Sequence, residues 1–368
     1  MASRKKMLIA GASGLVGSAA VNFFAAREDW DVVAVSRRAP IEASGAQFIA
    51  LDLADEKHCR QALAGVSGVT HLVYAAVNEQ ADNIVAGWSD AAQIDKNAAM
   101  LVNLLEPILA SSPGFEHISL VHGAKAYGSH LAQARVSLPY KESLPRVSQD
   151  NFYYRQEDYV AGRQKGQSWS WTVFRPVMIF GAATGSNMNV FLVLAVFAAL
   201  RKEAGLDLPM PAGRSVVVDA CDSDMIADAL EWAAGSASAR NEAFNLVNGD
   251  IFRMHDAFPV VAESMGMPLG APTAYDLVQQ IRELAHLWPV VVRKHRLQAS
   301  EDLDQLLGAS LQLAGGWTYD LGDGDPLGWG LTSTIKIRQA GFSGCMDSME
   351  MMRKYIRRYQ DLRILPPS

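Results

Sequence analysis

Three glycines near the start of the chain have a spacing that suits a phosphate-containing cofactor. Gly11, Gly14 and Gly17 follow a short apolar run, and an Ala-rich helix is expected after them, at residues 19–26. Gly11 permits a turn that a Cβ would penalise, Gly14 lets the backbone approach a pyrophosphate, and Gly17 permits close packing of helix on strand. Free N–H groups at the helix N-terminus attract phosphate. The turn therefore predicts a bound dinucleotide, although a glycine-rich turn without a ligand has the same pattern. Its other candidate contacts are Ser13, Leu15 and Val16.

Two arginines after the second predicted strand indicate which dinucleotide is bound. The strand at residues 30–35 runs directly into Ser36, Arg37 and Arg38. An enzyme built for NAD usually has a carboxylate here, which would repel a 2′-phosphate. Two guanidinium groups can instead bind that phosphate through paired, charge-assisted hydrogen bonds. The sequence therefore favours NADPH, with a solvated basic loop as the alternative.

The next two predicted strands, residues 47–51 and 70–74, also end in residues suited to the cofactor. Asp52 is placed to accept a hydrogen bond from the adenine amino group, and small side chains after the second strand leave room for the cofactor backbone. Asn97 lies on the helical stretch that follows, where a surface, a structural and a catalytic role all stay open. The candidates at the two strand ends are Asp52, Leu53, Ala75, Ala76 and Val77.

Composition excludes several classes of protein. The chain has 368 residues, 49% of them hydrophobic, which is enough to bury a large core, and its net charge of −6 gives no basic surface for nucleic acid. Three scattered cysteines and eight scattered histidines lack metal-ligand spacing, so no metal is expected. The most apolar stretch, residues 190–200, is about half of the roughly 20 residues that span a bilayer. We expect a cytoplasmic protein in which this stretch is a buried or interface helix.

Strands and helices alternate up to about residue 180, with further strands at residues 118–122 and 169–175. This pattern predicts an α/β fold with a Rossmann-type, doubly wound parallel sheet and a site at the carboxyl ends of its strands. We expect an NADP-binding domain over residues 1–185 and a smaller, mostly helical substrate-binding or lid domain over residues 186–368. A later segment near residues 215–250 is a candidate source of further core strands.

Several motifs together carry a resemblance to a known family. Beside the glycine turn and Ser36-Arg37-Arg38, they are Gly-x-Lys at 123–125, Pro-Tyr-x-Glu-x-Leu-Pro-Arg at 139–146, Asn-Phe-Tyr-Tyr-x-x-Glu-Asp at 151–158, Trp-Ser-Trp-Thr-Val-x-Arg-Pro at 169–176, and Asn-Glu-Ala-Phe-Asn at 241–245 with Asn-Gly-Asp at 248–250. By these segments the chain resembles the progesterone 5β-reductase and iridoid synthase-like family of atypical extended short-chain dehydrogenases/reductases, over nearly its whole length.

This resemblance implies a reaction and two catalytic residues. Ordinary short-chain dehydrogenases carry Tyr-x-x-x-Lys, whereas Glu157 stands four residues after Tyr153 here. The resemblance implies that Lys125 takes the place of the lysine in Tyr-x-x-x-Lys. Lys125 would then depress the pKa of the Tyr153 phenol and hold the cofactor ribose. It implies hydride transfer from NADPH to the β-carbon of an activated alkene, with Tyr153 donating to the carbonyl oxygen of a small hydrophobic substrate.

Further residues are expected around the nicotinamide and the substrate. The main chain after the last strand would contact the nicotinamide, and the candidates there are Pro176, Val177, Ile179, Ser186 and Met188. Tyr127 and Trp329 are candidates for the substrate pocket, and a homodimer is possible. The family continues Gly-x-Lys with His-Tyr-x-Gly-Pro-Phe, but residues 126–130 are Ala-Tyr-Gly-Ser-His, so the substrate itself stays open. Carbonyl reduction, sugar-nucleotide epimerisation and a non-catalytic NADP sensor are the alternatives.

Overall fold

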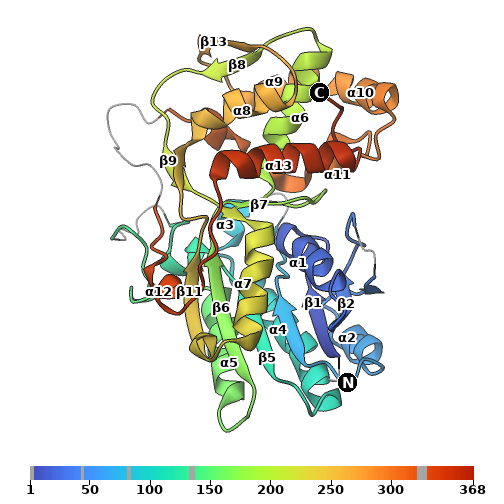
Figure 1. The fold of residues 1–368 in the computed structure, drawn as a ribbon, viewed down its shortest axis with the longest axis vertical. Helices are drawn as coiled ribbons and strands as arrows, with labels where there is room; N and C mark the ends of the chain where they lie inside the picture. Colours follow the sequence, from blue (N-terminus) through green and yellow to red (C-terminus); the bar gives the residue numbers. More distant parts are fainter. Residues whose placement is uncertain (1–3, 43–44, 81–83, 132–136, 321–329) are drawn as a thin grey trace. The chain divides into compact units, whose positions relative to one another are not determined.

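Seven parallel strands form the central sheet in the order β11-β6-β5-β4-β1-β2-β3 (Figure 1). The chain runs outward from β1 in one direction, then returns to β4 and runs outward in the other. Cofactors bind at such a reversal, beyond the carboxyl ends of the strands. The predicted doubly wound sheet is confirmed. Its strands are β1 (Lys5–Ala10), β2 (Trp30–Ser36), β3 (Gln47–Ala50), β4 (His71–Tyr74), β5 (His117–Val121), β6 (Ser170–Pro176) and β11 (Glu242–Leu246).

The computed structural model describes residues 4–42, 45–80, 84–131, 137–320 and 330–368. The chain forms two units, and the sheet belongs to the first, which comprises Met1–Ile179, Ser223–Val247 and Thr332–Gly344. The second comprises Phe180–Asp222, Asn248–Leu331 and Cys345–Ser368. The chain thus enters the first unit three times.

Helices flank the sheet of the first unit. A continuous apolar core joins the sheet to three of them: α2 (Glu56–Leu63), α4 (Ala91–Ser111) and α5 (Phe152–Gln164). Away from that core, α1 (Leu15–Ala25) packs along α7 (Ser223–Gly235), where Arg27 Nε lies 3.0 Å from Glu231 Oε1. Within residues 215–250, β11 and α7 belong to this unit, whereas β9 (Val217–Asp219) pairs with β12 (Ile251–Arg253) in the second unit.

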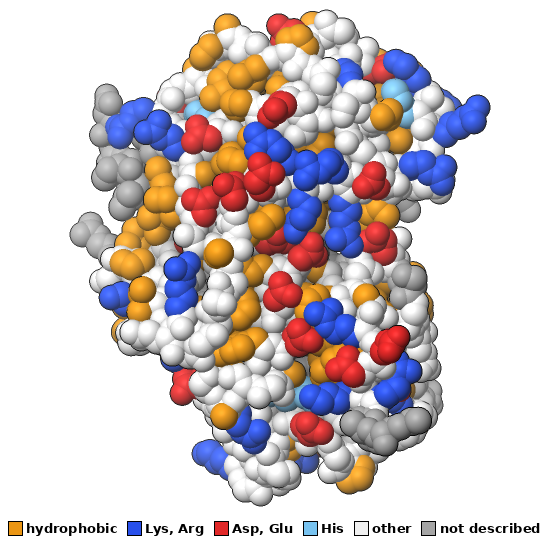
Figure 2. All heavy atoms as spheres, in the orientation of Figure 1, with side chains coloured by type: hydrophobic (Ala, Val, Ile, Leu, Met, Phe, Trp, Pro, Cys, Tyr) orange, Lys and Arg blue, Asp and Glu red, His pale blue; other side chains and the backbone are white. Residues whose placement is uncertain are grey.

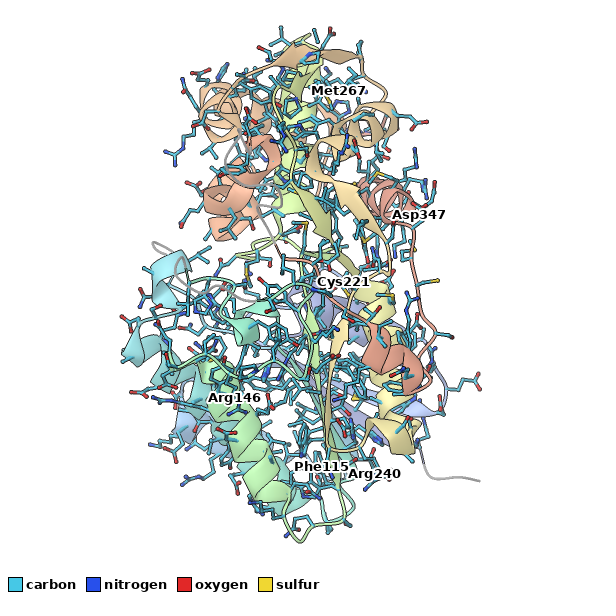
Figure 3. The ribbon with its side chains drawn as sticks, turned by 90° about the vertical axis from the view of Figure 1, so that its left-hand side faces the viewer. Phe115, Arg146, Cys221, Arg240, Met267 and Asp347 are labelled. Atoms are coloured by element: carbon cyan, nitrogen blue, oxygen red, sulfur yellow. The ribbon has the colours of Figure 1, made fainter. Side chains whose placement is uncertain are left out.

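The second unit is mostly helical and is built around α6 (Val190–Glu203). All side chains from Phe191 to Leu200 are buried, which confirms a buried helix in the most apolar stretch of the sequence. Trp317 is also fully buried, and its indole N–H donates to Val190 O at 2.9 Å. Throughout the described residues, the helices are too short or too polar to cross a membrane. The other elements include β8 (Leu208–Pro211), α8 (Ala257–Ser264), β13 (Leu269–Thr273), α9 (Leu277–Leu284), α10 (Trp288–His295) and α13 (Ser348–Asp361), which Asp347 caps (Figure 3).

The surface carries charges of both signs. On the face in Figure 2, Lys and Arg side chains are intermingled with Asp and Glu side chains. Several charged side chains of the described residues form ion pairs within one unit, such as Arg353 with Glu263 at 3.1 Å and Arg60 with Glu56 at 2.6 Å. Exposed pairs of this kind contribute little to stability.

The glycine turn between β1 and α1 is packed too closely for side chains. Gly11 has φ +83°, and a Cβ there would lie 2.6 Å from the Ala75 carbonyl oxygen. A Cβ on Gly17 would lie only 2.1 Å from the Gly11 carbonyl oxygen. The glycines thus bring β1, the first turn of α1 and the end of β4 into backbone contact.

A substitution at Gly17 tests this contact. We expect Gly17→Ala to lower the free energy of unfolding by about 3 kcal/mol, because the methyl group meets main-chain atoms that cannot move aside alone. Urea denaturation measures the change. Gly162→Ala, in the exposed last turn of α5 where no atom lies within 4 Å of the new Cβ, is the matched control and should be neutral or stabilise by about 0.5 kcal/mol. Equal stability of the two variants would contradict the packing argument.

Candidate active site

The N-terminus of α1 has the features of a phosphate site. Gly14 occupies the N-cap position in an extended conformation and provides no side-chain cap. The first N–H groups of a helix have no intrahelical acceptor, so those of Leu15, Val16 and Gly17 are available to an anion. Ser13 and Gly14 are partly exposed beside them. The close approach of Gly11 to Ala75 leaves this cradle clear of side chains, and the residues present fit a dinucleotide.

The arginine pair lies at the carboxyl end of β2. Arg37 and Arg38 are both exposed, whereas Ser36 is buried. The Ser36 hydroxyl donates to the carbonyl oxygen of Arg38 at 2.6 Å, which fixes the turn that carries the two guanidinium groups. Ser36 therefore shapes this turn, and the arginines stay the candidates for the ribose phosphate.

The candidate residues after β3 and β4 differ in how far they are exposed to solvent. Asp52 is exposed, and its carboxylate accepts a hydrogen bond from Ala54 N at 3.0 Å. Leu53 is buried, and its carbonyl oxygen accepts a bond from Asn103 at 2.9 Å. At the end of β4, Ala75, Ala76 and Val77 are partly exposed at the edge where the glycine turn approaches. A role of all five in cofactor binding stays a prediction.

Asn97 is fully buried in α4, and its amide is occupied by the protein itself. Its Oδ1 accepts from Asn78 N at 2.7 Å, and its Nδ2 donates to the carbonyl oxygens of Asn78 and Gln93 at 2.8 and 2.9 Å. The two bonds to Asn78 fasten the segment after β4 to α4, and the bond to Gln93 lies within the helix. They favour the structural role among the alternatives that the sequence leaves open.

Tyr153 and Lys125, which are 28 residues apart, contact the same side chain. The Lys125 Nζ lies 3.5 Å from the ring centroid of Trp88, and the Tyr153 ring meets Trp88 edge-on at 5.1 Å. Tyr153 also stacks on His122, with centroids 4.3 Å apart, and Phe152 packs on Trp88 at 4.5 Å. The structure therefore brings the two candidate catalytic residues to one aromatic cluster beyond β5.

The Asn-Phe-Tyr-Tyr motif holds these residues in place. Asn151 caps α5 by accepting from Tyr153 N at 2.9 Å, and its Nδ2 donates to the Lys125 carbonyl oxygen at 2.9 Å. The Tyr154 hydroxyl donates to Ala126 O at 2.6 Å. The last two bonds hold the backbone of the Gly-x-Lys segment against the first turn of α5. Asn151 and Tyr154 thus connect the two motifs directly.

Burial shifts the pKa values of both candidate catalytic groups. Burial lowers the pKa of the Lys125 ammonium to about 8, and the nearby Glu79 carboxylate opposes this change. Burial also raises the pKa of the Tyr153 phenol well above its usual value, and Glu79 adds to this change. The expectation that Lys125 depresses the pKa of Tyr153 is therefore wrong for the described residues, because burial and a nearby carboxylate dominate. The Tyr153 phenol therefore keeps its proton at neutral pH.

Comparison with known proteins identifies the family. Residues 7–305 match the PRISE-like Rossmann-fold domain. The chain belongs to the PRISE-like family. It is 28% identical to the (S)-8-oxocitronellyl enol synthase of Antirrhinum majus and 28% identical to the 3-oxo-Delta(4,5)-steroid 5-beta-reductase of Arabidopsis thaliana, and each alignment covers 98% of this chain and 92% of the relative. The resemblance and the expectation of an oxidoreductase of the extended short-chain dehydrogenase/reductase type are confirmed.

Solved structures support the fold of this PRISE-like protein. UDP-glucose 4-epimerase of Thermotoga maritima has a TM-score of 0.64 at 15% identity, covering 97% of this chain and 99% of that chain. The dTDP-glucose 4,6-dehydratase of Streptomyces venezuelae, solved with NAD, has a TM-score of 0.61 at 14% identity, covering 97% and 98%. Identity this low shows a common fold alone.

The predicted substrate-pocket residues have different outcomes in the PRISE-like chain. Tyr127 is 2% exposed, and its hydroxyl donates to Asn245 Oδ1 at 2.6 Å and accepts from Arg175 Nη1 at 3.1 Å. Arg175 is in turn paired with Glu157 at 3.1 Å. This buried network favours a structural role for Tyr127. Trp329 lies outside the described residues.

The candidate residues from the end of β6 onward are divided between the two units. Pro176 is buried, and its carbonyl oxygen lies 3.2 Å from where a Gly123 Cβ would stand, so only glycine fits there without a shift. Val177 and Ile179 are partly exposed in the first unit. Ser186 and Met188 belong to the second unit, where the Ser186 carbonyl oxygen accepts from Ser310. Their contacts with a nicotinamide stay predictions.

Sequence reasoning missed three residues of the aromatic cluster: Glu79, Trp88 and His122. His122 is buried directly after β5 and stacks on Tyr153. Burial lowers the pKa of His122 well below its usual value, so the ring is neutral. Its position directly after β5 was a usable signal, because polar residues at the carboxyl ends of these strands approach the site. Glu79 and Trp88 follow β4 at a greater distance, where no spacing rule points to them.

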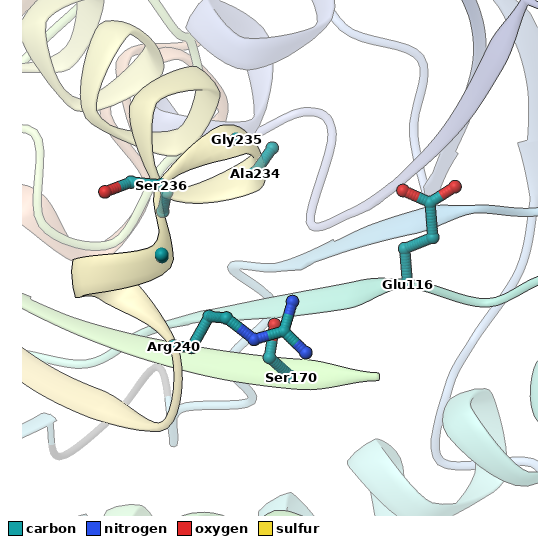
Figure 4. Close-up of a pocket in the computed structure, with 8 residues that line it drawn as sticks. Glu116, Ser170, Ala234, Gly235, Ser236 and Arg240 are labelled. Atoms are coloured by element: carbon teal, nitrogen blue, oxygen red, sulfur yellow. The ribbon is translucent and has the colours of Figure 1, made fainter. Parts of the chain in front are cut away.

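A pocket of the first unit lies at the amino ends of the strands, opposite the carboxyl ends where the candidate catalytic residues lie (Figure 4). Glu116 precedes β5 and Ser170 begins β6, so the pocket is at the amino ends of these strands. Arg240 and the end of α7 complete its lining, with a volume of about 170 Å³. It contains none of the candidate catalytic residues.

Two variants of Asn151 test the connection between the motifs. We expect Asn151→Ala to lower the free energy of unfolding by about 2 kcal/mol, because the α5 cap and the bond to the Lys125 carbonyl are both lost. Asn151→Ser keeps a capping oxygen but is too short to reach Lys125, so it should lose about 1 kcal/mol. Urea denaturation distinguishes them. Wild-type stability in both variants would contradict the conclusion that Asn151 stabilises the contact between α5 and the Gly-x-Lys segment.

Proposed function

We propose that this protein is an NADPH-dependent reductase of enones or enals that transfers hydride to the β-carbon of the activated alkene. The observation that carries the proposal is the meeting of Tyr153 and Lys125 at Trp88, beyond the carboxyl ends of the central strands. A phenol donor beside an ammonium group stabilises an oxygen that gains negative charge. The substrate class is a small hydrophobic molecule with a conjugated carbonyl group.

The names of the two relatives support this reaction. A 3-oxo-Delta(4,5)-steroid contains a carbonyl group conjugated to a double bond, and its 5-beta-reductase reduces that double bond. An enol synthase forms an enol. Hydride addition to the β-carbon of an enone or enal gives an enolate, and its protonation on oxygen gives an enol. One chemical step therefore accounts for both names, and we infer the same step for this chain.

The residues of the chain would each have a defined task in this step. NADPH, when bound, supplies the hydride. As the alkene electron pair shifts toward the carbonyl group, Tyr153 donates a hydrogen bond to the oxygen that becomes an enolate. Its raised pKa keeps the proton available at neutral pH. Lys125 adds positive charge at the same aromatic cluster, and the rings of Trp88 and Phe152 pack against Tyr153 and shield it from water.

NADPH is our proposal for the cofactor because two exposed arginines follow β2 where an NAD enzyme carries a carboxylate. The glycine turn and the uncapped N-terminus of α1 would bind the pyrophosphate. A cytoplasmic location and a homodimer stay predictions from the sequence.

Removal of the Tyr153 hydroxyl tests the proposed donor. We expect Tyr153→Phe to lower kcat for 2-cyclohexen-1-one by about 100-fold or more, because the enolate oxygen loses its preorganised donor. NADPH affinity, measured by fluorescence titration, should change less than about threefold. Tyr154→Phe is the matched control: it loses the bond donated to Ala126 O and the one accepted from Val147 N, so it should lower stability by about 1–2 kcal/mol with a much smaller effect on kcat. Full turnover by Tyr153→Phe would refute the assignment.

The arginine pair provides a test of cofactor choice. The double variant Arg37→Ala, Arg38→Ala should bind NADPH about 100-fold more weakly, because two charge-assisted contacts to the 2′-phosphate are lost. Its affinity for NADH, which lacks that phosphate, should stay within about twofold of wild type. Isothermal titration with both cofactors measures this. A parallel loss of affinity for NADH would mean that the arginines maintain the fold of the turn instead.

A further inference from the structure

We propose that Glu79 is the counter-ion of Lys125 and acts as a positioning residue that holds the ammonium group charged beside Tyr153. This inference rests on the proposed function for its catalytic consequence. The ion pair itself can be tested without turnover.

The geometry forms a closed group of three side chains. The Glu79 side chain is 1% exposed, and its Oε1 lies 3.9 Å from the Lys125 Nζ. The same oxygen accepts a hydrogen bond from the Trp88 indole N–H at 3.2 Å. The face of Trp88 lies 3.5 Å from the Lys125 Nζ. Trp88 thus orients the carboxylate with its edge and contacts the ammonium with its ring.

Two side-chain amides of α4 fix the backbone on both sides of Glu79. Asn97 bonds both the N–H and the carbonyl oxygen of Asn78, and Gln93 Oε1 accepts from Gln80 N at 2.9 Å. Gln93 reaches this position beside Gly87, where a Cβ would lie 2.7 Å from its Oε1. The fold therefore positions a buried carboxylate, rather than merely tolerating one.

A buried carboxylate requires a compensating interaction, because the loss of its hydration costs free energy. Attraction to the Lys125 ammonium is such an interaction. Burial favours the neutral form of Lys125, and the Glu79 carboxylate favours its charged form. Among the described residues, the other titratable side chains packed around this cluster are Tyr153, His130 and His122. Burial lowers the pKa of both histidines and raises that of Tyr153, so all three are neutral near pH 7. Glu79 is the carboxylate that meets the Lys125 charge there.

The titration of Lys125 tests the pair in the full-length protein without substrate. Acetic anhydride acetylates neutral lysine, so the pH dependence of Lys125 labelling, followed by mass spectrometry, reports its pKa. We expect Glu79→Gln to lower this pKa from about 8 by about 1 unit or more, because the opposing charge is lost while burial remains. The control is Glu116→Gln, at the opposite edge of the sheet, which should leave the Lys125 titration unchanged. An unchanged titration in Glu79→Gln overturns the proposal.

Turnover then tests the catalytic consequence. Lysine loses its charge as pH rises through its pKa, so kcat/KM of the wild type should fall above about pH 8. In Glu79→Gln this alkaline limb should move down by the same amount as the Lys125 titration, with activity recovering at lower pH. If the titration moves and the pH profile does not, the counter-ion stands but its catalytic role, and with it the role of Lys125 in the proposed function, is overturned.

A second variant covers the case in which Glu79→Gln fails to fold. Trp88→Phe keeps an aromatic face but removes the N–H that orients Glu79. It should lower the Lys125 pKa in the same direction by a smaller amount, and Glu79→Asp should retain most of the wild-type value. A Lys125 pKa that rises or stays constant in Trp88→Phe contradicts the arrangement.

Discussion

The cost of keeping a charged ammonium group in a partly buried position is the constraint on which the candidate catalytic cluster of this protein depends. An isolated buried charge shifts its pKa until it becomes neutral, unless a partner compensates for lost water. Lys125 is 22% exposed, and it has an aromatic face and a carboxylate within 4 Å. Most of the polar contacts around it position those partners: amides of α4 hold the segment of Glu79, and Asn151 holds the Lys125 backbone.

The cofactor end depends on a different interaction, the close approach of main chain to main chain. There the side chains are absent by necessity, because a Cβ at Gly11 or Gly17 would occupy the position of a carbonyl oxygen. A cradle made of backbone N–H groups does not depend on the side chains of later segments of the chain. Such a cradle is compatible with a fold that is shared at low sequence identity, as with the epimerase and the dehydratase.

Local sequence was sufficient to predict most strands of the sheet and the cofactor turn, since these depend on short-range patterns. Apolar runs located β2, β3, β4, β5 and β6 to within one residue of their ends, and the glycine spacing located the turn between β1 and α1. The strand β11 was harder, because it joins the sheet from beyond residue 240. At the site, the family motifs gave Tyr153 and Lys125. Glu79 and Trp88 could not be predicted, because their meeting with Lys125 depends on tertiary packing.

The same limit explains the error in the pKa of Tyr153. From sequence, a lysine near a phenol suggests a stabilised phenolate. The degree of burial and the carboxylate of Glu79 are properties of the fold, and they reverse the sign of the shift. The reversed sign suits a hydrogen-bond donor better than a base, which agrees with a role at an oxygen that gains charge.

The most direct test of the central claim is the position of the transferred hydride. The purified protein would be supplied with NADPH carrying deuterium at the transferable position and with 2-cyclohexen-1-one, and the product would be analysed by NMR. Conjugate reduction predicts a saturated ketone with deuterium on the former β-carbon. Deuterium on the carbonyl carbon of an allylic alcohol would contradict the account and make the protein a carbonyl reductase on the same scaffold.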